Sequence, residues 1–219
     1  MYERYIKRIL DFIFAVVLLI VLSPIMLLAA IAIKIEDPKG PVLFKQERVG
    51  KMNKSFKVYK FRSMIVEQEK NGIKLDDAER MLKVGNILRK SSVDELPQLF
   101  NIIRGEMSFI GPRPLPVIYL PYYTEEEIHR HDITPGISGW AQVNGRNYLS
   151  WEERFKYDLE YVNNISFLFD VKIFIMTIKK VFIKSDVGVR GVDFPDRSLH
   201  KIRKPNNQIN IYSSEVHGK

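Results

Sequence analysis

The feature that most constrains this chain is an apolar run near its N-terminus. Residues 12–33 form a stretch of 22 residues without a single charged side chain. A straight helix of that length is about 33 Å long, enough to cross a hydrocarbon core of about 30 Å. The run is too long for the apolar region of a signal peptide, and no small-residue cleavage site follows it. It therefore predicts a membrane helix.

Two residues interrupt this run near its middle, Ser23 and Pro24. Pro24 cannot donate a hydrogen bond to the carbonyl of Ile20, and its ring crowds the preceding turn, so we expect the helix to kink or break there. The Ser23 hydroxyl can bond to a carbonyl that the proline leaves free. Each half of the run is only about half a bilayer long.

The charges that flank the run are positive on both sides. Because cytoplasmic flanks collect Lys and Arg, a spanning helix should have one basic end and one that is not. We therefore interpret residues 1–36 as a re-entrant membrane helix that enters one leaflet, bends at Pro24 and leaves on the same side. A single spanning anchor is the alternative. The flanking cations are Arg4, Lys7 and Arg8 before the run, and Lys34, Lys39, Lys45, Arg48 and Lys51 after it.

Composition excludes several classes of protein. The 219 residues contain no cysteine, which excludes a disulfide scaffold, a thiolate zinc site and a cysteine nucleophile. The hydrophobic content of 46% excludes a disordered chain. The formal net charge of +8 favours an anionic partner, such as nucleic acid, anionic lipid or a phosphorylated metabolite.

The remaining sequence predicts an α+β fold that is mainly helical with a small β-hairpin. Residues 42–46 and 56–61 flank a polar loop, as the strands of a hairpin do. Helical spacing of apolar residues predicts helices over 76–89 and 96–103, and Gly105 ends the second. Two capping boxes begin further helices, Thr124 with Glu127 and Ser150 with Glu153.

The segment 166–184 is strongly apolar but contains four charged residues. This pattern suits an amphipathic helix in the membrane interface whose lysines reach toward water, and a buried core helix is the alternative. We expect residues 37–186 to form a cytoplasmic domain that includes this interfacial helix, and residues 187–219 to form a polar C-terminal tail. The four charged residues are Asp170, Lys172, Lys179 and Lys180.

Asp94 and Glu95 are adjacent carboxylates at the expected start of a helix. One interpretation is helix capping, either by a Ser92–Glu95 capping box or by Asp94 itself, with Pro97 in the first turn. The other is an ionised carboxylate nucleophile beside a metal-binding carboxylate. The helix dipole favours ionisation of both groups, and a divalent cation would offset their mutual repulsion.

Five basic residues are candidate phosphate contacts. Together they can form a pocket for a diphosphate, and a guanidinium held on a proline-stiffened loop is already oriented for one. The chain contains no P-loop, dinucleotide-binding, nucleophile-elbow or zincin motif, and no nucleic-acid-binding module. The candidates are Lys60, Arg62, Arg89, Arg113 in Gly111-Pro112-Arg113-Pro114, and Arg146 in Asn144-Gly145-Arg146-Asn147.

In this order the motifs resemble the bacterial sugar transferase family, the monotopic phosphoglycosyl transferases, in their minimal catalytic form. The resemblance extends over about residues 2–184. It rests on the basic N-terminus, the Ser23-Pro24 break, Lys60-Phe61-Arg62-Ser63-Met64, Asp94-Glu95-Leu96-Pro97-Gln98, Asn101 through Met107-Ser108, Gly111-Pro112-Arg113-Pro114, and the run from Pro135-Gly136 to Gly145-Arg146.

This resemblance implies transfer of a phospho-sugar from a UDP-sugar to undecaprenyl phosphate, with release of UMP. It implies that Asp94 is the nucleophile of a covalent aspartyl-phosphosugar intermediate, and that Glu95, beside Asp94, binds Mg²⁺. The reaction would be the first membrane step of a bacterial glycan, such as a capsule, exopolysaccharide, O-antigen or glycoprotein glycan. The enzyme would be monotopic in the inner membrane, in contact with its lipids, with the catalytic domain facing the cytoplasm.

Other functions stay open at this point. A non-enzymatic adaptor that binds anionic lipid explains the apolar helix and the charge, though not the ordered motifs. A membrane-anchored nucleic-acid-binding domain and a glycosyltransferase that releases UDP are further alternatives, and we expect no nucleic-acid partner. The sequence leaves open the sugar, the glycan pathway, the role of the tail and the oligomeric state, a homo-oligomer included.

Overall fold

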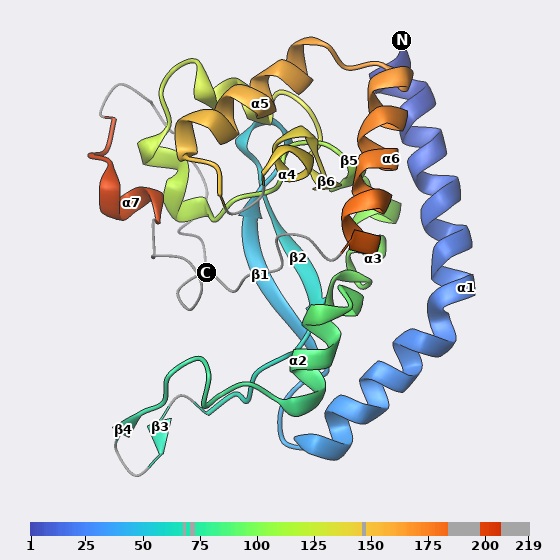
Figure 1. The fold of residues 1–219 in the computed structure, drawn as a ribbon, viewed down its shortest axis with the longest axis vertical. Coiled ribbons are helices and arrows are strands. Elements are labelled where there is room, and N and C mark those ends of the chain that lie inside the picture. The colour runs from blue at the N-terminus through green and yellow to red at the C-terminus, as the bar shows by residue number, and fades with distance from the viewer. Residues whose placement is uncertain (68, 71–72, 146–147, 184–197, 207–219) are drawn as a thin grey trace, which may run out of the picture. The chain divides into compact units, whose positions relative to one another are not determined.

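The computed structural model describes residues 1–67, 69–70, 73–145, 148–183 and 198–206. These residues form two compact units. Unit 1 consists of Met1–Lys7, Glu47–Phe56 and the chain from Ser108 onward, and unit 2 consists of Arg8–Gln46 and Lys57–Met107. The elements are mainly helices with three two-stranded sheets, which confirms the predicted α+β class (Figure 1).

The predicted membrane segment is one helix, α1 (Lys7–Glu36), preceded by a π-helical turn, η1 (Tyr2–Ile6). Its axis changes direction along its length, but the helix continues through Pro24 (Figure 1). The Ser23 hydroxyl donates to the Ile20 carbonyl oxygen at 2.8 Å. This is the carbonyl that a proline at position 24 cannot bond, so the serine replaces the missing backbone hydrogen bond.

Most large apolar side chains of α1 face outward. Ile20 is 69% exposed and Leu28 is 67% exposed. By length and composition, 2–36 is the one helix among the described residues that is long and apolar enough to cross a membrane. Near its C-terminal end, however, Ala29 and Ile33 are buried in a cluster with Phe61, Leu82 and Leu88 of unit 2. The helix therefore exposes an apolar surface along most of its length, while its last turns pack on the protein.

The predicted hairpin is present and longer than expected. Strand β1 (Leu43–Val49) pairs with β2 (Ser55–Phe61) through a short turn, η2 (Lys51–Asn53). The rest of unit 2 contains the small pair β3 (Glu69–Lys70) and β4 (Ile73–Lys74), helix α2 (Lys83–Lys90), the 3₁₀ turn η3 (Val93–Glu95) and helix α3 (Gln98–Arg104). Helix α3 ends at Gly105 with φ of 82°, as predicted, because glycine adopts this left-handed conformation without strain.

The predicted helix over 76–89 is wrong in its first half. Asp76 and Glu79 bond to each other's backbone N–H groups in a separate turn. Met81 then forms a β-bridge with Met64, and the Leu82 N–H donates to the Ser63 carbonyl. These backbone groups are engaged with the segment that follows β2, so the helix begins only after Leu82. Apolar spacing alone did not reveal this competition.

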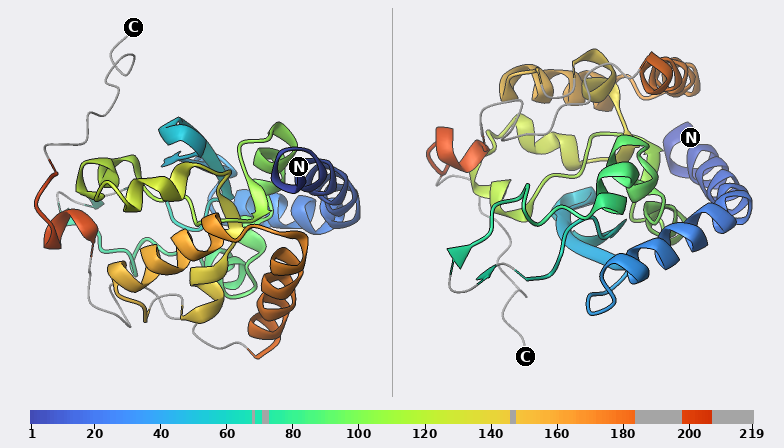
Figure 2. Two further views of the ribbon diagram at one scale, coloured as in Figure 1. Left: turned by 90° about the horizontal axis from the view of Figure 1, so that it is seen from above. Right: turned by 60° about the horizontal axis from the view of Figure 1, so that its bottom comes forward.

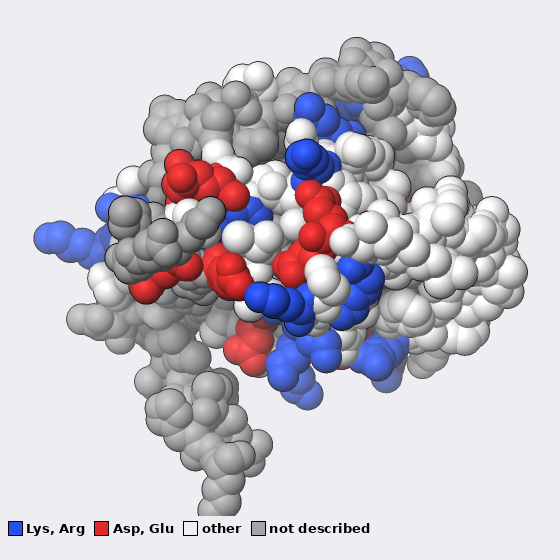
Figure 3. Space-filling view, turned by 90° about the horizontal axis from the view of Figure 1, so that it is seen from below, with Lys and Arg blue, Asp and Glu red and all other residues white. Residues whose placement is uncertain are grey.

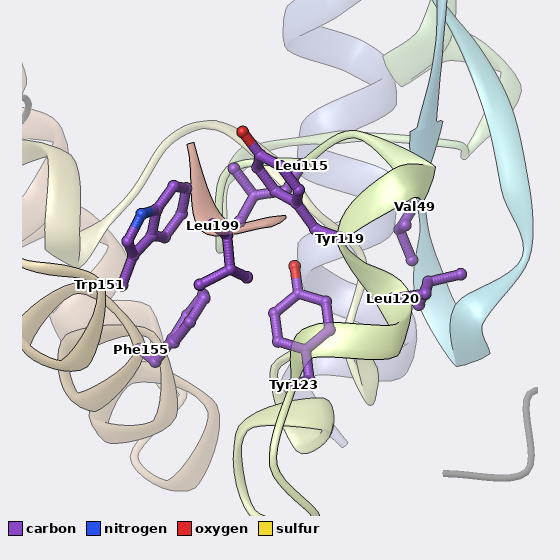
Figure 4. Close-up of a cluster of buried hydrophobic side chains, with 8 residues drawn as sticks. All are labelled: Val49, Leu115, Tyr119, Leu120, Tyr123, Trp151, Phe155 and Leu199. Atoms are coloured by element: carbon purple, nitrogen blue, oxygen red, sulfur yellow. The ribbon is translucent and has the colours of Figure 1, made fainter. Parts of the chain in front are cut away.

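Unit 1 is built around a cluster of buried apolar side chains, shown in Figure 4. Both predicted capping boxes form, but Thr124–Glu127 begins only the 3₁₀ turn η5 (Glu127–His131), whereas Ser150–Glu153 begins α5 (Trp151–Asn163). The cluster consists of Val49, Leu115, Tyr119, Leu120, Tyr123, Trp151, Phe155 and Leu199. The other elements are η4 (Val117–Tyr122), α4 (Trp140–Asn144), and the parallel strands β5 (Ser108–Ile110) and β6 (Gly136–Ser138).

The described part of the predicted polar tail is not loose. Helix α7 (Leu199–Ile202) places Leu199, which has no exposed surface, in the core of unit 1. The guanidinium of Arg203 pairs with Glu127 at 2.7 Å and with Glu152 at 2.6 Å. A short helix with one buried leucine carries no periodic signal, so this docking could not be predicted from the sequence.

Helix α6 (Phe167–Ile183) confirms the predicted helix over 166–184 and follows α5 after a change of direction (Figure 2). Its apolar side chains are largely exposed, with Leu168 at 78% and Phe174 at 53%. Asp170 is buried and accepts hydrogen bonds from Lys7 and Tyr2 of the N-terminus, both at 2.6 Å. The helix is therefore not buried in the core as a whole, and its interfacial position stays a prediction that the exposed apolar face suits.

Helix α2 lies directly against the segment that follows β2, and Gly85 is the point of contact. A Cβ at Gly85 would lie 2.2 Å from the carbonyl oxygen of Ser63, which is backbone and cannot turn aside. One turn later, Arg89 Nε donates to the Ser63 hydroxyl at 2.8 Å. The glycine thus allows α2 and this segment to approach each other.

We predict that Gly85→Ala destabilises the protein, although alanine favours helices by about 1 kcal/mol over glycine. Overpacking against fixed backbone typically costs about 1–3 kcal/mol and outweighs that gain. Denaturant unfolding in detergent micelles should show a lower midpoint. The control is Asn86→Ala, at the next and exposed position of α2, which should change the free energy of unfolding by less than about 0.5 kcal/mol. A raised midpoint in Gly85→Ala would contradict the close contact.

Candidate active site

The two adjacent carboxylates lie in the 3₁₀ turn η3, between α2 and α3, and all three elements belong to unit 2. Asp94 is only 9% exposed. Ser92 precedes them with φ of 58°, a left-handed conformation that turns the chain between the helices. Neither predicted cap forms, because η3 and α3 both begin without a side-chain cap, and the Glu95 N–H bonds to the Ser92 backbone carbonyl instead. Capping therefore does not explain the Asp94–Glu95 pair.

Lys60 of β2 faces this turn. Its ammonium nitrogen lies 2.5 Å from Glu95 Oε1, and both side chains are about three-quarters buried. This ion pair explains a lysine on a strand face that it shares with the buried Val58. It also shows that the carboxylates at η3 are approached by a cation from the neighbouring strand.

Arg62, two residues further along, is held almost entirely by protein acceptors. Its Nε donates to the Pro41 carbonyl at 2.6 Å, and its two terminal nitrogens bond to Asp37 and to the Met64 carbonyl. The Arg62 guanidinium holds the pKa of the Asp37 carboxyl below its usual value. These contacts favour a structural role for Arg62 in closing the loop after α1.

Asn101 of α3 connects this helix to β2. It has no exposed surface, accepts from the Tyr59 N–H at 3.1 Å, and donates to the Lys57 carbonyl at 2.8 Å and to Glu106 at 2.7 Å. The strand that carries Lys60 and the turn that carries Glu95 are thereby fixed relative to each other. The sequence analysis did not assign this role, although an asparagine among the apolar residues of a helix was a usable signal.

Arg113 belongs to unit 1, and the backbone of its loop is held by a buried ion pair. Arg130 donates to the Arg113 carbonyl at 2.8 Å and pairs with Asp158 at 2.8 Å, and neither charged side chain of the pair is more than 2% exposed. Burial and the Arg130 charge lower the pKa of His131 to about 2, so His131 stays neutral beside the guanidinium.

Arg146 lies outside the described residues. The structure therefore places Lys60, Arg62 and Arg89 in the unit of Asp94 and Glu95, and Arg113 in the other.

A preformed metal site is not found among the described residues, where no group of three or more His, Asp or Glu side chains can hold an ion. Mg²⁺ usually needs fewer protein ligands, because one or two carboxylates and the phosphates of a substrate complete its coordination with water. Asp94 and Glu95 fit that arrangement, and the Lys60 ammonium already occupies a cation position at Glu95. Both carboxylates could thus hold Mg²⁺ together with a diphosphate.

Charged side chains also gather on the surface. The space-filling view from below shows acidic side chains bordered by Lys and Arg, whereas the side formed by α1 is broadly uncharged (Figure 3).

Comparison with known proteins shows the family of this chain. Residues 2–184 match the family described as bacterial sugar transferase. The chain is 46% identical to the uncharacterized sugar transferase EpsL of Bacillus subtilis (strain 168) over 184 residues, which is 83% of this chain and 90% of that protein.

Two longer relatives have named reactions. The chain is 43% identical to the UDP-N-acetylgalactosamine-undecaprenyl-phosphate N-acetylgalactosaminephosphotransferase of Aeromonas hydrophila, over 81% of this chain and 44% of that protein. It is 41% identical to the UDP-glucose:undecaprenyl-phosphate glucose-1-phosphate transferase of Escherichia coli (strain K12), over 83% of this chain and 41% of that protein. It therefore spans less than half the length of these two relatives. From the family match over residues 2–184, and from 46% identity to a relative of which 90% is covered, the chain belongs to the bacterial sugar transferase family.

Proposed function

We propose that this chain moves a phospho-sugar from a UDP-sugar to undecaprenyl phosphate through a covalent intermediate on Asp94, and releases UMP. The observation that carries the proposal is Asp94 itself. It is a nearly buried carboxylate in a short turn that begins without a side-chain cap, and it lies next in the chain to Glu95, which pairs with Lys60. The relatives named for donor and acceptor support the same reaction class.

The proposed reaction has two displacements at one phosphorus atom. The Asp94 carboxylate attacks the phosphorus that bears the sugar, and the bond from this phosphorus to the UMP oxygen breaks. An oxygen of undecaprenyl phosphate then attacks the same phosphorus, and the Asp94 carboxylate leaves. One phosphorus–oxygen bond forms and one breaks in each step, so positioning and neutralisation of charge supply most of the catalysis.

Two cations of unit 2 are the proposed phosphate contacts beside Asp94. Lys60 can exchange its bond to Glu95 for one to a donor phosphate, and Arg89 donates to the Ser63 hydroxyl through Nε. Arg113 and Arg146 remain predicted contacts, whereas Arg62 is better explained by its protein partners. Mg²⁺, held by Glu95 with Asp94, would supply neutralisation of the diphosphate charge.

We further propose that α1 is re-entrant and that both of its ends lie on the cytoplasmic side of the inner membrane. The bend, the Ser23–Ile20 hydrogen bond and the basic residues on both flanks support this topology. The exposed apolar side chains of α6 suit contact with the same leaflet. The product would begin a lipid-linked glycan such as a capsule or exopolysaccharide.

Isotope exchange tests the covalent intermediate directly. We predict that the enzyme, supplied with UDP-sugar and labelled UMP but no lipid acceptor, transfers label into UDP-sugar, because the first displacement is reversible by itself. Because the relatives are named for N-acetylgalactosamine, glucose and galactose, a panel of these UDP-sugars is used. Asp94→Asn should lower the exchange rate at least about 1,000-fold.

The matched control is Asp132→Asn, an exposed carboxylate of unit 1 that bonds to His129, and it should exchange at the wild-type rate. No exchange in the wild type, with UMP formed only when acceptor is present, would point to direct transfer in a single step. Release of UDP would indicate a glycosyltransferase, and no turnover with any donor would favour the lipid-binding adaptor.

Single cysteines test the topology, since the chain has none of its own. Tyr5→Cys and Phe44→Cys lie on either side of the apolar run, both wild-type side chains are about half exposed, and neither change alters the charge of the flanks. In inverted and right-side-out membrane vesicles, we predict that a membrane-impermeant maleimide labels both positions only from the cytoplasmic face. Labelling from opposite faces would show that α1 spans the membrane.

A further inference from the structure

We propose that α1 is a strut that positions the Asp94–Glu95 turn, with Arg8 and Glu36 as positioning residues at its two ends. This inference rests on the proposed function, because it concerns the same turn η3. It assigns the membrane helix a part in shaping the site in addition to anchoring the protein. Every contact that supports it lies within unit 2.

The C-terminal end of α1 caps helix α2. The Glu36 carboxylate accepts hydrogen bonds from the backbone N–H groups of Lys83 at 2.7 Å and Val84 at 2.9 Å. These are the first residues of α2, which has no side-chain cap of its own at Leu82. A carboxylate at this position satisfies two free N–H groups and complements the positive end of the helix dipole.

The N-terminal end of α1 caps helix α3. The guanidinium of Arg8 donates to the carbonyl oxygens of Ile102 at 2.6 Å and Ile103 at 2.7 Å, in the last turn of α3. Gly105 leaves room for it, since a Cβ there would lie 3.3 Å from the guanidinium. A cation at this end complements the negative pole of the helix.

The order of these elements along the chain connects the two caps to the same turn. The chain runs from α2 through η3 to α3, so Asp94 and Glu95 lie between the two helices. Glu36 holds the far end of α2 and Arg8 holds the far end of α3. The α1 segment between Arg8 and Glu36 would be about 40 Å long if straight. Its bend sets the distance between its ends, and therefore where the two helices hold the turn.

Apolar packing makes the strut stiff at its C-terminal end. Ala29 and Ile33 of α1 are buried against Leu82 and Leu88, which lie at the beginning and near the end of α2. A change in the bend of α1 would therefore move α2 along with it. An anchor without this role would need neither the two caps nor this packing.

Hydrogen exchange measured by mass spectrometry tests the strut on the full chain in liposomes of phosphatidylethanolamine and phosphatidylglycerol. We expect Glu36→Ala and Arg8→Ala each to raise amide exchange across residues 92–97 by about 5- to 30-fold, as loss of a helix cap allows. Each should lower kcat and leave KM for the UDP-sugar within about twofold. The double variant should differ little from either single variant, because releasing one end already frees the strut.

The controls separate this role from anchoring and from unfolding. Arg4→Ala removes a basic charge close to Arg8, and Glu125→Gln removes an exposed carboxylate of unit 1. Both variants should match the wild type in amide exchange at residues 92–97 and in kcat. Exchange in α5 should stay unchanged in all variants. If Glu36→Ala unfolds the protein, Glu36→Gln, which keeps one acceptor oxygen, should give the same pattern at smaller size.

Two results would overturn the strut and leave two independent caps. One is increased amide exchange confined to residues 83–86 or 102–105. The other is a double variant in which the two single-variant changes in exchange and kcat multiply. This test of the strut does not depend on which residue is the nucleophile. If Asp94→Asn stays active while the Glu36 and Arg8 variants raise exchange at residues 92–97 as expected, the strut is supported and the assignment of Asp94 as nucleophile is wrong.

Discussion

The hydrogen bond from Ser23 to the Ile20 carbonyl is the interaction on which the proposed re-entrant path of α1 depends. In hydrocarbon, a backbone carbonyl without a partner costs several kcal/mol, and Pro24 would leave one. The serine supplies the donor, so that α1 can change direction and remain a helix. A bent helix can turn back within one leaflet, and its two ends can then contact two other helices on the same side.

From that helix the arrangement of the site follows in steps. Glu36 and Arg8 hold the outer ends of α2 and α3, and the turn between those helices carries Asp94 and Glu95. Asn101 joins α3 to β2, and Lys60 extends from β2 to Glu95. In this unit, polar contacts thus connect the apolar helix to the carboxylates.

Local signals in the sequence predicted much of this fold. The apolar run with its proline, the hairpin, the glycine end of α3 and the Ser150–Glu153 capping box all depend on residues close together in the chain. The sequence also singled out the Asp94–Glu95 pair and Lys60 as candidates, and the resemblance implied the chemistry of the two carboxylates, which stays a prediction. The proposed capping role of the pair was wrong, because Pro97 begins α3 without a side-chain cap.

Features that depend on distant residues could not be predicted in this way. The helix over 76–89 lost its first half to backbone bonds with Ser63, and the caps of α2 and α3 come from residues 47 to 95 positions away. The burial of Leu199 and the enclosure of Arg62 by Asp37 and Pro41 likewise need the folded chain. Each is a contact that periodicity and local motifs do not encode.

In the proposed reaction, Asp94 carries the phospho-sugar between the donor and the lipid. The most direct measurement is peptide mass spectrometry of enzyme quenched at low pH after incubation with UDP-sugar in the absence of acceptor. We expect a peptide that contains Asp94 and whose mass is increased by one sugar phosphate. Fragment ions should place the added group on Asp94. The added mass should disappear when undecaprenyl phosphate is added before the quench. An adduct on another residue, or no adduct while UMP accumulates in an amount equal to the enzyme, would contradict it.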